Sequence, residues 1–215
     1  TKDEGHFCLI TCNHDTARLA PRLTPEELAV AYGMILTMPG VPFLYYGDEI
    51  GMRYRNLPTK EGGYVRTGTR TPMQWDASAN LGFSTANADD LYLPVDPAPD
   101  APTVEAQQAD DGSLYHWVRT VLSLRETHAA LQADAAFDVV AAPEHGRLFA
   151  YARTSRDGSD RLVIALNPGL GTESFPLPDA ATSHGTPTME LSRGNVAADG
   201  TTVTLGPQSF VAFSF

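Results

Sequence analysis

Two apolar segments that flank one well-marked helix constrain the fold of this chain most strongly. Phe7–Thr11 has the composition of a short buried strand, and Val41–Tyr46 is a second apolar strand. Residues 24–38 between them have the composition of a helix. Strand, helix and strand within about forty residues form a βαβ unit, whose two strands run parallel. The first part of the chain is therefore of the α/β class.

The helix between these strands carries strong local start and stop signals. Thr24 is a favourable N-cap, Pro25 suits the first helical position, and Glu27 lies three residues after the cap. Pro39 and Gly40 then prevent the helix from continuing beyond about Met38.

A long stretch after the second strand is rich in Gly, Pro, Asn and Asp. We expect residues 53–111 to be mostly irregular, and loops of this length inside compact domains tend to be functional. A helix is predicted over 113–130. Its buried stripe is expected at i, i+3, i+4, i+7 and i+8, which are the positions Leu114, Trp117, Val118, Val121 and Leu122.

The pattern changes to short strands after about residue 133. Val211, Phe213 and Phe215 alternate as in a half-buried strand, and turn signals separate several segments. We therefore expect two domains, at 1–133 and 134–215, the second an antiparallel β-sandwich. Its predicted strands are Phe137–Ala141, Arg147–Thr154, Arg161–Asn167, Thr188–Leu191, Thr201–Leu205 and Ser209–Phe215.

Composition excludes several classes of function. The 215 residues include 15 Lys and Arg against 26 Asp and Glu, a formal charge of −11. This charge disfavours nucleic acid and anionic membrane surfaces as partners. Cys8 and Cys12 are expected to be buried, and they are too far apart along a strand to form a disulfide. Neither a metal site nor a cofactor is indicated.

Polar residues follow the first strand at the end where ligand chemistry gathers in parallel α/β folds. Asn13-His14-Asp15 places a carboxylate beside an imidazole, which suits acid–base work or stabilisation of positive charge. The tripeptide alone is weak, because Asx-rich turns are common after strands. Three further segments follow in order: 41–51, Arg70–Asp76 and Leu81–Ser84.

Together these segments resemble the α-amylase superfamily of glycoside hydrolases. The stretch Arg70–Trp75, Arg-Thr-Pro-Met-Gln-Trp, is similar to the branch of α-glucosidases, oligo-1,6-glucosidases and trehalose synthases. The resemblance implies the C-terminal part of a (β/α)₈ TIM barrel followed by an antiparallel β-domain. Phe7–Thr11 then resembles barrel strand seven and Val41–Tyr46 strand eight, and residues 113–130 the last barrel helix.

The resemblance also implies roles for single residues. Asp15 would stabilise the oxocarbenium-like transition state, and His14 would hydrogen-bond the same sugar, whereas Asn13 would form the turn. Arg70 could donate bidentate hydrogen bonds to substrate hydroxyls or to an acid. Arg18 could pair with an acid of the pocket, and Gln74 and Trp75 could line its mouth. The nucleophile and the acid/base of a retaining enzyme would precede Thr1.

Asp48 and Glu49 offer a different interpretation, in which they form a catalytic pair with Asp15. The resemblance favours a structural role for them, tying loops to the barrel rim.

The expected parent protein is thus a glycosidase that hydrolyses or transglycosylates α-glucosides or oligosaccharides, and we expect this chain alone to be inactive. The alternatives are a non-catalytic structural or carbohydrate-binding module and an inactive partner subunit. The start of the chain resembles the continuation of a longer protein, so an exposed barrel edge at Phe7–Thr11 could cause self-association. The compartment stays open, with the cytoplasm slightly favoured.

Overall fold

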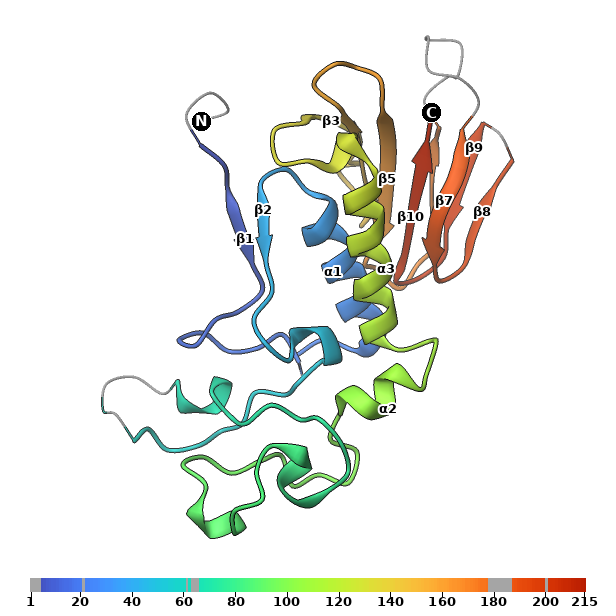
Figure 1. Ribbon diagram of the computed structural model, residues 1–215. Coiled ribbons are helices and arrows are strands. Elements are labelled where there is room, and N and C mark those ends of the chain that lie inside the picture. Colours follow the sequence, from blue (N-terminus) through green and yellow to red (C-terminus); the bar gives the residue numbers. More distant parts are fainter. Residues whose placement is uncertain (1–4, 21, 61, 63–65, 178–186, 200) are drawn as a thin grey trace. The chain divides into compact units, whose positions relative to one another are not determined.

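The computed structural model describes residues 5–20, 22–60, 62, 66–177, 187–199 and 201–215 (Figure 1). These residues form two compact units, and the boundaries between the units fall inside helices and strands and not in a linker. One unit contains 29–41 and 121–215 together with the segment that ends at Cys8, and the other contains Leu9–Leu28 and Pro42–Thr120. No helix among the described residues is both long and apolar enough to cross a bilayer.

The expected strand, helix and strand are present, with shorter strands. They are β1 (Cys8–Ile10), α1 (Pro25–Thr37) and β2 (Val41–Phe43). β1 and β2 pair in a two-stranded sheet, and their arrows point the same way in Figure 1.

The expectation that Phe7–Thr11 is a buried strand is wrong, and the second strand is exposed as well. The side chains of Phe7, Cys8, Ile10, Val41 and Phe43 are exposed. The physical reason is that β1 and β2 form a sheet of only two strands in the described chain, so their outer edges and faces have no cover.

Helix α1 begins as the sequence predicts. Glu27 N–H donates to Thr24 Oγ1 over 3.2 Å, and Thr24 N–H donates to Glu27 Oε2 over 2.8 Å. This reciprocal capping box satisfies two donors that would otherwise lack partners at the helix start.

Two arginines satisfy the carbonyl groups at the other end of α1. Arg153 is fully buried and donates to the carbonyls of Thr37 (2.6 Å), Gln132 (2.7 Å) and Ala136 (3.1 Å). Burial and repulsion from Arg125 lower the pKa of Arg153 to about 10. The second arginine, Arg125, donates to the carbonyls of Leu36, Met38 and Gly40.

Residues 53–111 are mostly irregular, as expected. Short 3₁₀ turns punctuate the loop at Thr67–Thr69, Ala79–Gly82 and Ala88–Asp90. The loop also contains α2 (Val104–Gln108), a five-residue helix that was not predicted. Thr103 Oγ1 caps it by accepting from Ala106 N–H.

Helix α3 (Leu114–Thr127) follows and ends before a 3₁₀ turn at Ala129–Leu131. Four of the five predicted stripe positions are buried. Leu122 was placed wrongly, because its side chain is 39% exposed, and Leu124 takes its place in the buried stripe. The stripe continues at i+3 from Val121, so it follows the helical period to a different residue.

The C-terminal strands form two antiparallel sheets. Five strands take the order β3-β4-β5-β10-β7 and three take the order β6-β9-β8. All six predicted strands are present, with end shifts, and β6 and β8 were missed. The bounds are β3 Ala136–Ala141, β4 Phe149–Thr154, β5 Arg161–Asn167, β6 Glu173–Pro176, β7 Thr188–Arg193, β8 Val196–Ala198, β9 Thr202–Leu205 and β10 Ser209–Ser214.

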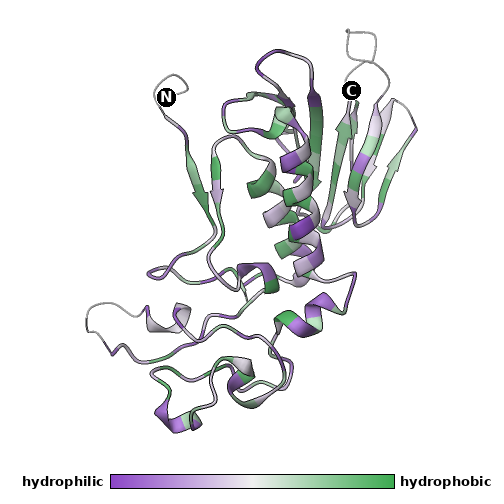
Figure 2. Ribbon diagram, in the orientation of Figure 1, coloured by the Kyte–Doolittle hydropathy of each residue, from purple (hydrophilic) through white to green (hydrophobic). Residues whose placement is uncertain are grey.

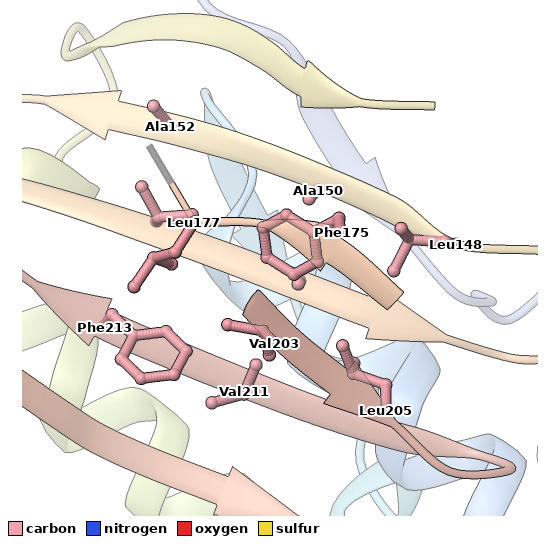
Figure 3. Packing of buried hydrophobic residues seen from close by; sticks show 11 residues of the cluster. Leu148, Ala150, Ala152, Phe175, Leu177, Val203, Leu205, Val211 and Phe213 are labelled. Carbon is pink, nitrogen blue, oxygen red and sulfur yellow. The ribbon is translucent and has the colours of Figure 1, made fainter. Parts of the chain in front are cut away.

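One hydrophobic core contains residues from both sheets. Figure 3 shows Phe175 and Val203 from the smaller sheet beside Phe213 from the larger one. β10 was expected to be half-buried, and this is wrong, since Phe210 and Ala212 on its other face are fully buried too. In Figure 2 the ribbon of β10 has the colours of hydrophobic residues, in agreement with its burial on both faces.

The second buried face of β10 packs against α1. A Cβ atom on Gly33 would lie 2.7 Å from Cδ2 of the Phe210 ring, so the ring occupies the space that a side chain on the helix would need. β10 therefore lies between two apolar layers, which explains why its sequence is almost continuously apolar.

Candidate active site

A tight turn that begins at Asn13, shortly after the end of β1, presents His14 and Asp15. Asn13 Oδ1 accepts a hydrogen bond from Asp15 N–H over 2.8 Å, and Asn13 N–H donates to Thr16 Oγ1 over 3.0 Å. These contacts are those of an Asx turn, so Asn13 shapes the backbone, as expected. The turn fixes the two following side chains at the end of the strand.

Asp15 is the centre of an ionic cluster. Its Oδ1 accepts from Arg66 Nη1 over 3.0 Å and from Arg70 Nη2 over 2.8 Å. Its Oδ2 lies 3.3 Å from Nε2 of His14. The Asp15 side chain nevertheless stays 31% exposed and His14 is 64% exposed, so both remain open to a ligand.

These neighbours keep Asp15 ionised. Desolvation acts to raise the pKa of the carboxyl group. The hydrogen bond from Arg70 and the charges of His14, Arg66 and Arg70 outweigh it and hold the pKa below its usual value of 3.8. At neutral pH the Asp15 side chain therefore stays ionised, and an ionised carboxylate is suited to stabilising positive charge close to it.

Arg70 connects the long loop to this turn. Besides its ion pair with Asp15, it donates from Nε to the carbonyl oxygen of His14 over 2.9 Å. The structure thus brings together three residues that the sequence analysis had selected: His14, Asp15 and Arg70. It adds Arg66, which was not selected although it begins the same loop segment. No local signal marks it, because it lies 51 positions from Asp15.

Arg18 does not join this cluster. Its side chain is 1% exposed, its Nη1 lies 3.3 Å from Asp48 Oδ1, and its Nη2 donates to the carbonyl of Thr69. The guanidinium carbon also lies 4.9 Å from the ring centroids of both Tyr45 and Tyr46. Arg18 is therefore held in the interior, where it contacts protein rather than a ligand.

Asp48 is the acid that Arg18 neutralises. Its carboxylate also accepts hydrogen bonds from Thr11 Oγ1 (2.6 Å), Cys12 Sγ (3.2 Å) and Tyr45 N–H (3.2 Å). Because this buried carboxylate is saturated with donors, it serves to join segments of the chain. This geometry speaks against Asp48 as half of a catalytic pair.

Two neighbours of Asp48 are also removed from solvent: Cys12 is buried and Glu49 is half-buried. Burial raises the pKa of the Glu49 carboxyl above 4.5 and, with the charge of Asp48, raises the pKa of the Cys12 thiol to about 12. Both cysteines are free, and Cys8 is exposed although we expected both to be buried.

Gln74 and Trp75 differ from each other in exposure. Gln74 is 1% exposed and its amide donates to the carbonyl of Pro102, so it packs the loop and does not line a pocket mouth. Trp75 is 50% exposed, while its backbone pairs with Leu81 and Glu105. Of the two, only Trp75 has a side chain that a ligand could reach.

The comparison with protein families decides the relationship. The pattern of the α-amylase family, described as "Alpha amylase, catalytic domain", matches residues 2–134, well over half of the chain. The chain belongs to the α-amylase family.

The similarity of this chain to individual relatives agrees with its assignment to the α-amylase family. It is 36% identical over 171 residues to trehalose synthase/amylase TreS of Mycobacterium tuberculosis, covering 75% of this chain and 26% of that protein. It is 28% identical over 212 residues to oligo-1,6-glucosidase of Heyndrickxia coagulans, covering 82% of this chain and 37% of that protein. The chain thus spans about a quarter to two fifths of the length of these relatives.

Solved structures show the same fold. Trehalulose synthase MutB from Pseudomonas mesoacidophila MX-45 superposes with a TM-score of 0.78 at 24% identity, covering 96% of this chain and 42% of that one. At this identity the likeness concerns the fold alone.

Proposed function

We propose that this chain is the C-terminal part of a retaining α-glycosidase that acts on α-glucosides or oligosaccharides by hydrolysis or transglycosylation. In this proposal Asp15 stabilises the transition state, and His14 hydrogen-bonds a hydroxyl group of the same sugar. Arg70 holds Asp15 in position and borders the substrate, with Trp75 near the entrance. Arg18 and Gln74 are left out, because both side chains are buried and bound to other parts of the chain.

One observation carries the proposal. Asp15 sits at the end of β1, its carboxyl pKa is held below 3.8, and its side chain is still partly exposed. A retaining glycosidase passes through a transition state with oxocarbenium character, so positive charge develops on the sugar ring. A carboxylate that remains ionised and accessible lowers the energy of such a charge.

The proposal assigns bond cleavage to residues outside this chain. Retaining enzymes need a nucleophile and an acid/base whose carboxyl groups lie about 5–5.5 Å apart. Asp48, which the sequence offers as a member of a catalytic carboxylate pair, is buried, and its carboxylate is fully hydrogen-bonded. We therefore expect the chain by itself to bind sugar without turning it over.

The finer fold assignment belongs to the same proposal. Residues 1–133 would supply strands seven and eight, the long active-site loop and the last helix of a (β/α)₈ barrel. Residues 134–215 would be a β-sandwich domain. The parallel pairing of β1 and β2 and the core shared by the two C-terminal sheets support this arrangement.

The decisive experiment measures binding of a charged sugar mimic. The 215-residue chain is titrated by NMR with 1-deoxynojirimycin, a cation at neutral pH, and with glucose, which is neutral. We expect a preference for the cation that Asp15→Asn reduces about tenfold, because a charged hydrogen bond is lost. The matched control, Asp157→Asn, makes the same change at an exposed turn and should keep the preference.

Three results would overturn the proposal. The role of Asp15 would be refuted by an equal response to both ligands, or by a cation preference that survives Asp15→Asn. The absence of the nucleophile would be refuted by turnover of maltose, isomaltose, sucrose or trehalose that Asp15→Asn abolishes. Sugar binding without any dependence on Asp15 would favour a non-catalytic carbohydrate-binding module.

A further inference from the structure

The two arginines that bind Asp15 are attached to the ends of one short buried turn. The 3₁₀ turn Thr67–Thr69 has Arg66 directly before it and Arg70 directly after it. All three residues of the turn are buried, and the N–H of Arg70 donates to the first carbonyl of the turn over 3.0 Å. The place of this turn in the structure therefore sets the point from which both guanidinium groups extend.

Thr69 connects this buried turn to the turn that carries Asp15. Its Oγ1 donates to the carbonyl oxygen of Thr16 over 3.0 Å. Thr16 closes the turn that begins at Asn13, because its N–H donates to the Asn13 carbonyl over 3.3 Å and its Oγ1 accepts from Asn13 N–H over 3.0 Å. One hydroxyl group thus joins the segment that carries the arginines to the segment that carries the carboxylate.

Arg18 holds Thr69 through its backbone. Nη2 of the guanidinium donates to the Thr69 carbonyl over 3.2 Å, and Nη1 lies 3.3 Å from Asp48 Oδ1. The rings of Tyr45 and Tyr46 contact the same guanidinium. The planar fork of an arginine fixes the direction of its donors, so Thr69 is held at its carbonyl and at its hydroxyl together.

Gly68 places the middle of the turn against another backbone segment. A Cβ atom at this position would lie 1.6 Å from the carbonyl oxygen of Arg55, and Arg55 N–H donates to the Gly68 carbonyl over 3.2 Å. The turn therefore has no room to move toward Arg55.

The contacts of Arg66 and Arg70 with Asp15 depend on such support. Their side chains are long and partly exposed, so each has many alternative rotamers. Hydrogen bonds weaken steeply when distance or angle departs from its optimum. Functional side chains accordingly need a surrounding shell that fixes them to within about 0.5 Å.

We propose that Arg18 and Thr69 are positioning residues, which hold the turn Thr67–Thr69 in place so that Arg66 and Arg70 reach the Asp15 carboxylate. The inference rests on the proposed function and deepens it. It names two residues that act on the transition-state stabiliser through other residues, without touching substrate.

The titration of Asp15 tests the role of Thr69. The pKa of Asp15 is measured in the 215-residue chain by ¹³C-carboxyl NMR, with the signal assigned by Asp15→Asn. Desolvation acts to raise this pKa, and the hydrogen bond from Arg70 and the nearby positive charges hold it below 3.8. Thr69→Val replaces the hydroxyl by a methyl group and loosens these contacts, so we expect the pKa to rise toward 3.8.

Two further substitutions separate positioning from a general loss of packing. Thr69→Ser keeps the hydroxyl group and should retain the low pKa of Asp15. Thr67→Val is the matched control in the same turn. Both threonines are fully buried, but Thr67 Oγ1 has no hydrogen-bond partner among the described residues, so its loss should leave the pKa of Asp15 unchanged.

Arg18→Lys tests the same support from its other end. Lysine keeps the positive charge beside Asp48 but lacks the planar fork that reaches both Asp48 and the Thr69 carbonyl. We expect the pKa of Asp15 to rise here too, and because the charge is kept, the rise reports position. Arg119→Lys, the same change at an exposed position of α3, should have no effect.

The positioning role and the proposed function can fail separately. An Asp15 pKa that stays at its wild-type value in the folded Thr69→Val or Arg18→Lys chain would overturn the positioning role. A rise that Thr67→Val matches, or that Thr69→Ser also shows, would overturn it as well. These titrations contain no sugar, so a cation preference that depends on Asp15 could still stand. Conversely, a pKa that responds as expected would uphold the positioning role even if the chain bound the cation and glucose equally.

Discussion

At the scale of single residues, two guanidinium groups from one loop set the charge state of the Asp15 carboxylate. Arg66 and Arg70 share one carboxylate oxygen, and the other oxygen lies beside His14. This arrangement explains how the Asp15 carboxylate can be both ionised and accessible to a ligand. Either property alone is common in proteins, but a transition-state stabiliser needs both.

The titration of Asp15 gives a direct test of this arrangement. Replacing Arg70 by Ala should raise the pKa of the Asp15 carboxyl toward 3.8, because the strongest hydrogen bond to the ionised form is lost. A ¹³C-carboxyl NMR titration measures it. Arg53→Ala, which removes the arginine that pairs with Asp96 and Asp100, should leave Asp15 unchanged. An Asp15 pKa that is the same with and without Arg70 would contradict the assignment.

The same shift links Asp15 to stability. Its pKa is lower in the folded chain than in the unfolded chain, so the folded state binds fewer protons near that pKa. The stabilisation is therefore complete above pH 3.8 and is lost as the pH falls through the lower, folded value.

At the scale of the elements, the end of α1 depends on two arginines, the fully buried Arg153 and the half-buried Arg125, whose guanidinium groups donate to backbone carbonyls. Arg153 and Arg125 donate to seven carbonyl groups between them. The negative end of the helix dipole and these oxygens together compensate the cations. This arrangement joins α1 to the segment that leads into the β-domain.

Removing one of these arginines should be costly. Arg153→Met keeps much of the length and apolar volume but leaves buried carbonyls without donors, so we expect a loss of about 2–4 kcal/mol in the free energy of unfolding. Arg156→Met is the matched control. Arg156 is 88% exposed, and this change should stay within about 0.5 kcal/mol. Urea unfolding at neutral pH measures both, and equal midpoints would contradict the role of Arg153.

The elements also show what could be predicted from the sequence. α1 carries its own signals in Thr24, Pro25 and Glu27, so its start was predictable from neighbouring residues. β8 has three residues and β6 includes Pro176, so neither has a strong local pattern, and both depend on pairing with β9. β10 looked half-buried because the sequence does not reveal that α1 covers its second face.

The candidate site, too, was predictable only where its residues lie in local motifs. His14, Asp15 and Arg70 could be selected because they lie in motifs with a known relation to each other. The ion pair from Arg66 and the burial of Arg18 and Gln74 result from contacts across many positions of the chain. Such contacts have no trace in the local sequence.

At the scale of the whole molecule, the two-stranded sheet and its flanking residue Phe7 expose several large apolar side chains. Phe7 is 65% exposed, Phe43 53% and Ile10 47%. Unpaired strand edges with apolar side chains favour pairing with another chain. We propose that the chain associates with itself through β1 and β2.

Light scattering after size exclusion tests this association. We expect dimers or larger species, and more of them at high salt, because screening weakens the repulsion between chains of formal charge −11. Ile10→Lys should shift the population toward monomer. Leu170→Lys, which places the same charge at a residue that is 80% exposed in the β-domain, should not. A monomer at all concentrations and salt levels would refute the proposal.

The contact between Gly33 and Phe210 has a consequence for how such chains can be recombined. A helix residue without a side chain and a strand residue with a large ring fill one volume between them. A chimera that took residues 134–215 from a relative with a different residue at position 210 would therefore inherit either a void or a collision at this spot. The β-domain is matched to its own helix, and the two must be exchanged as a pair.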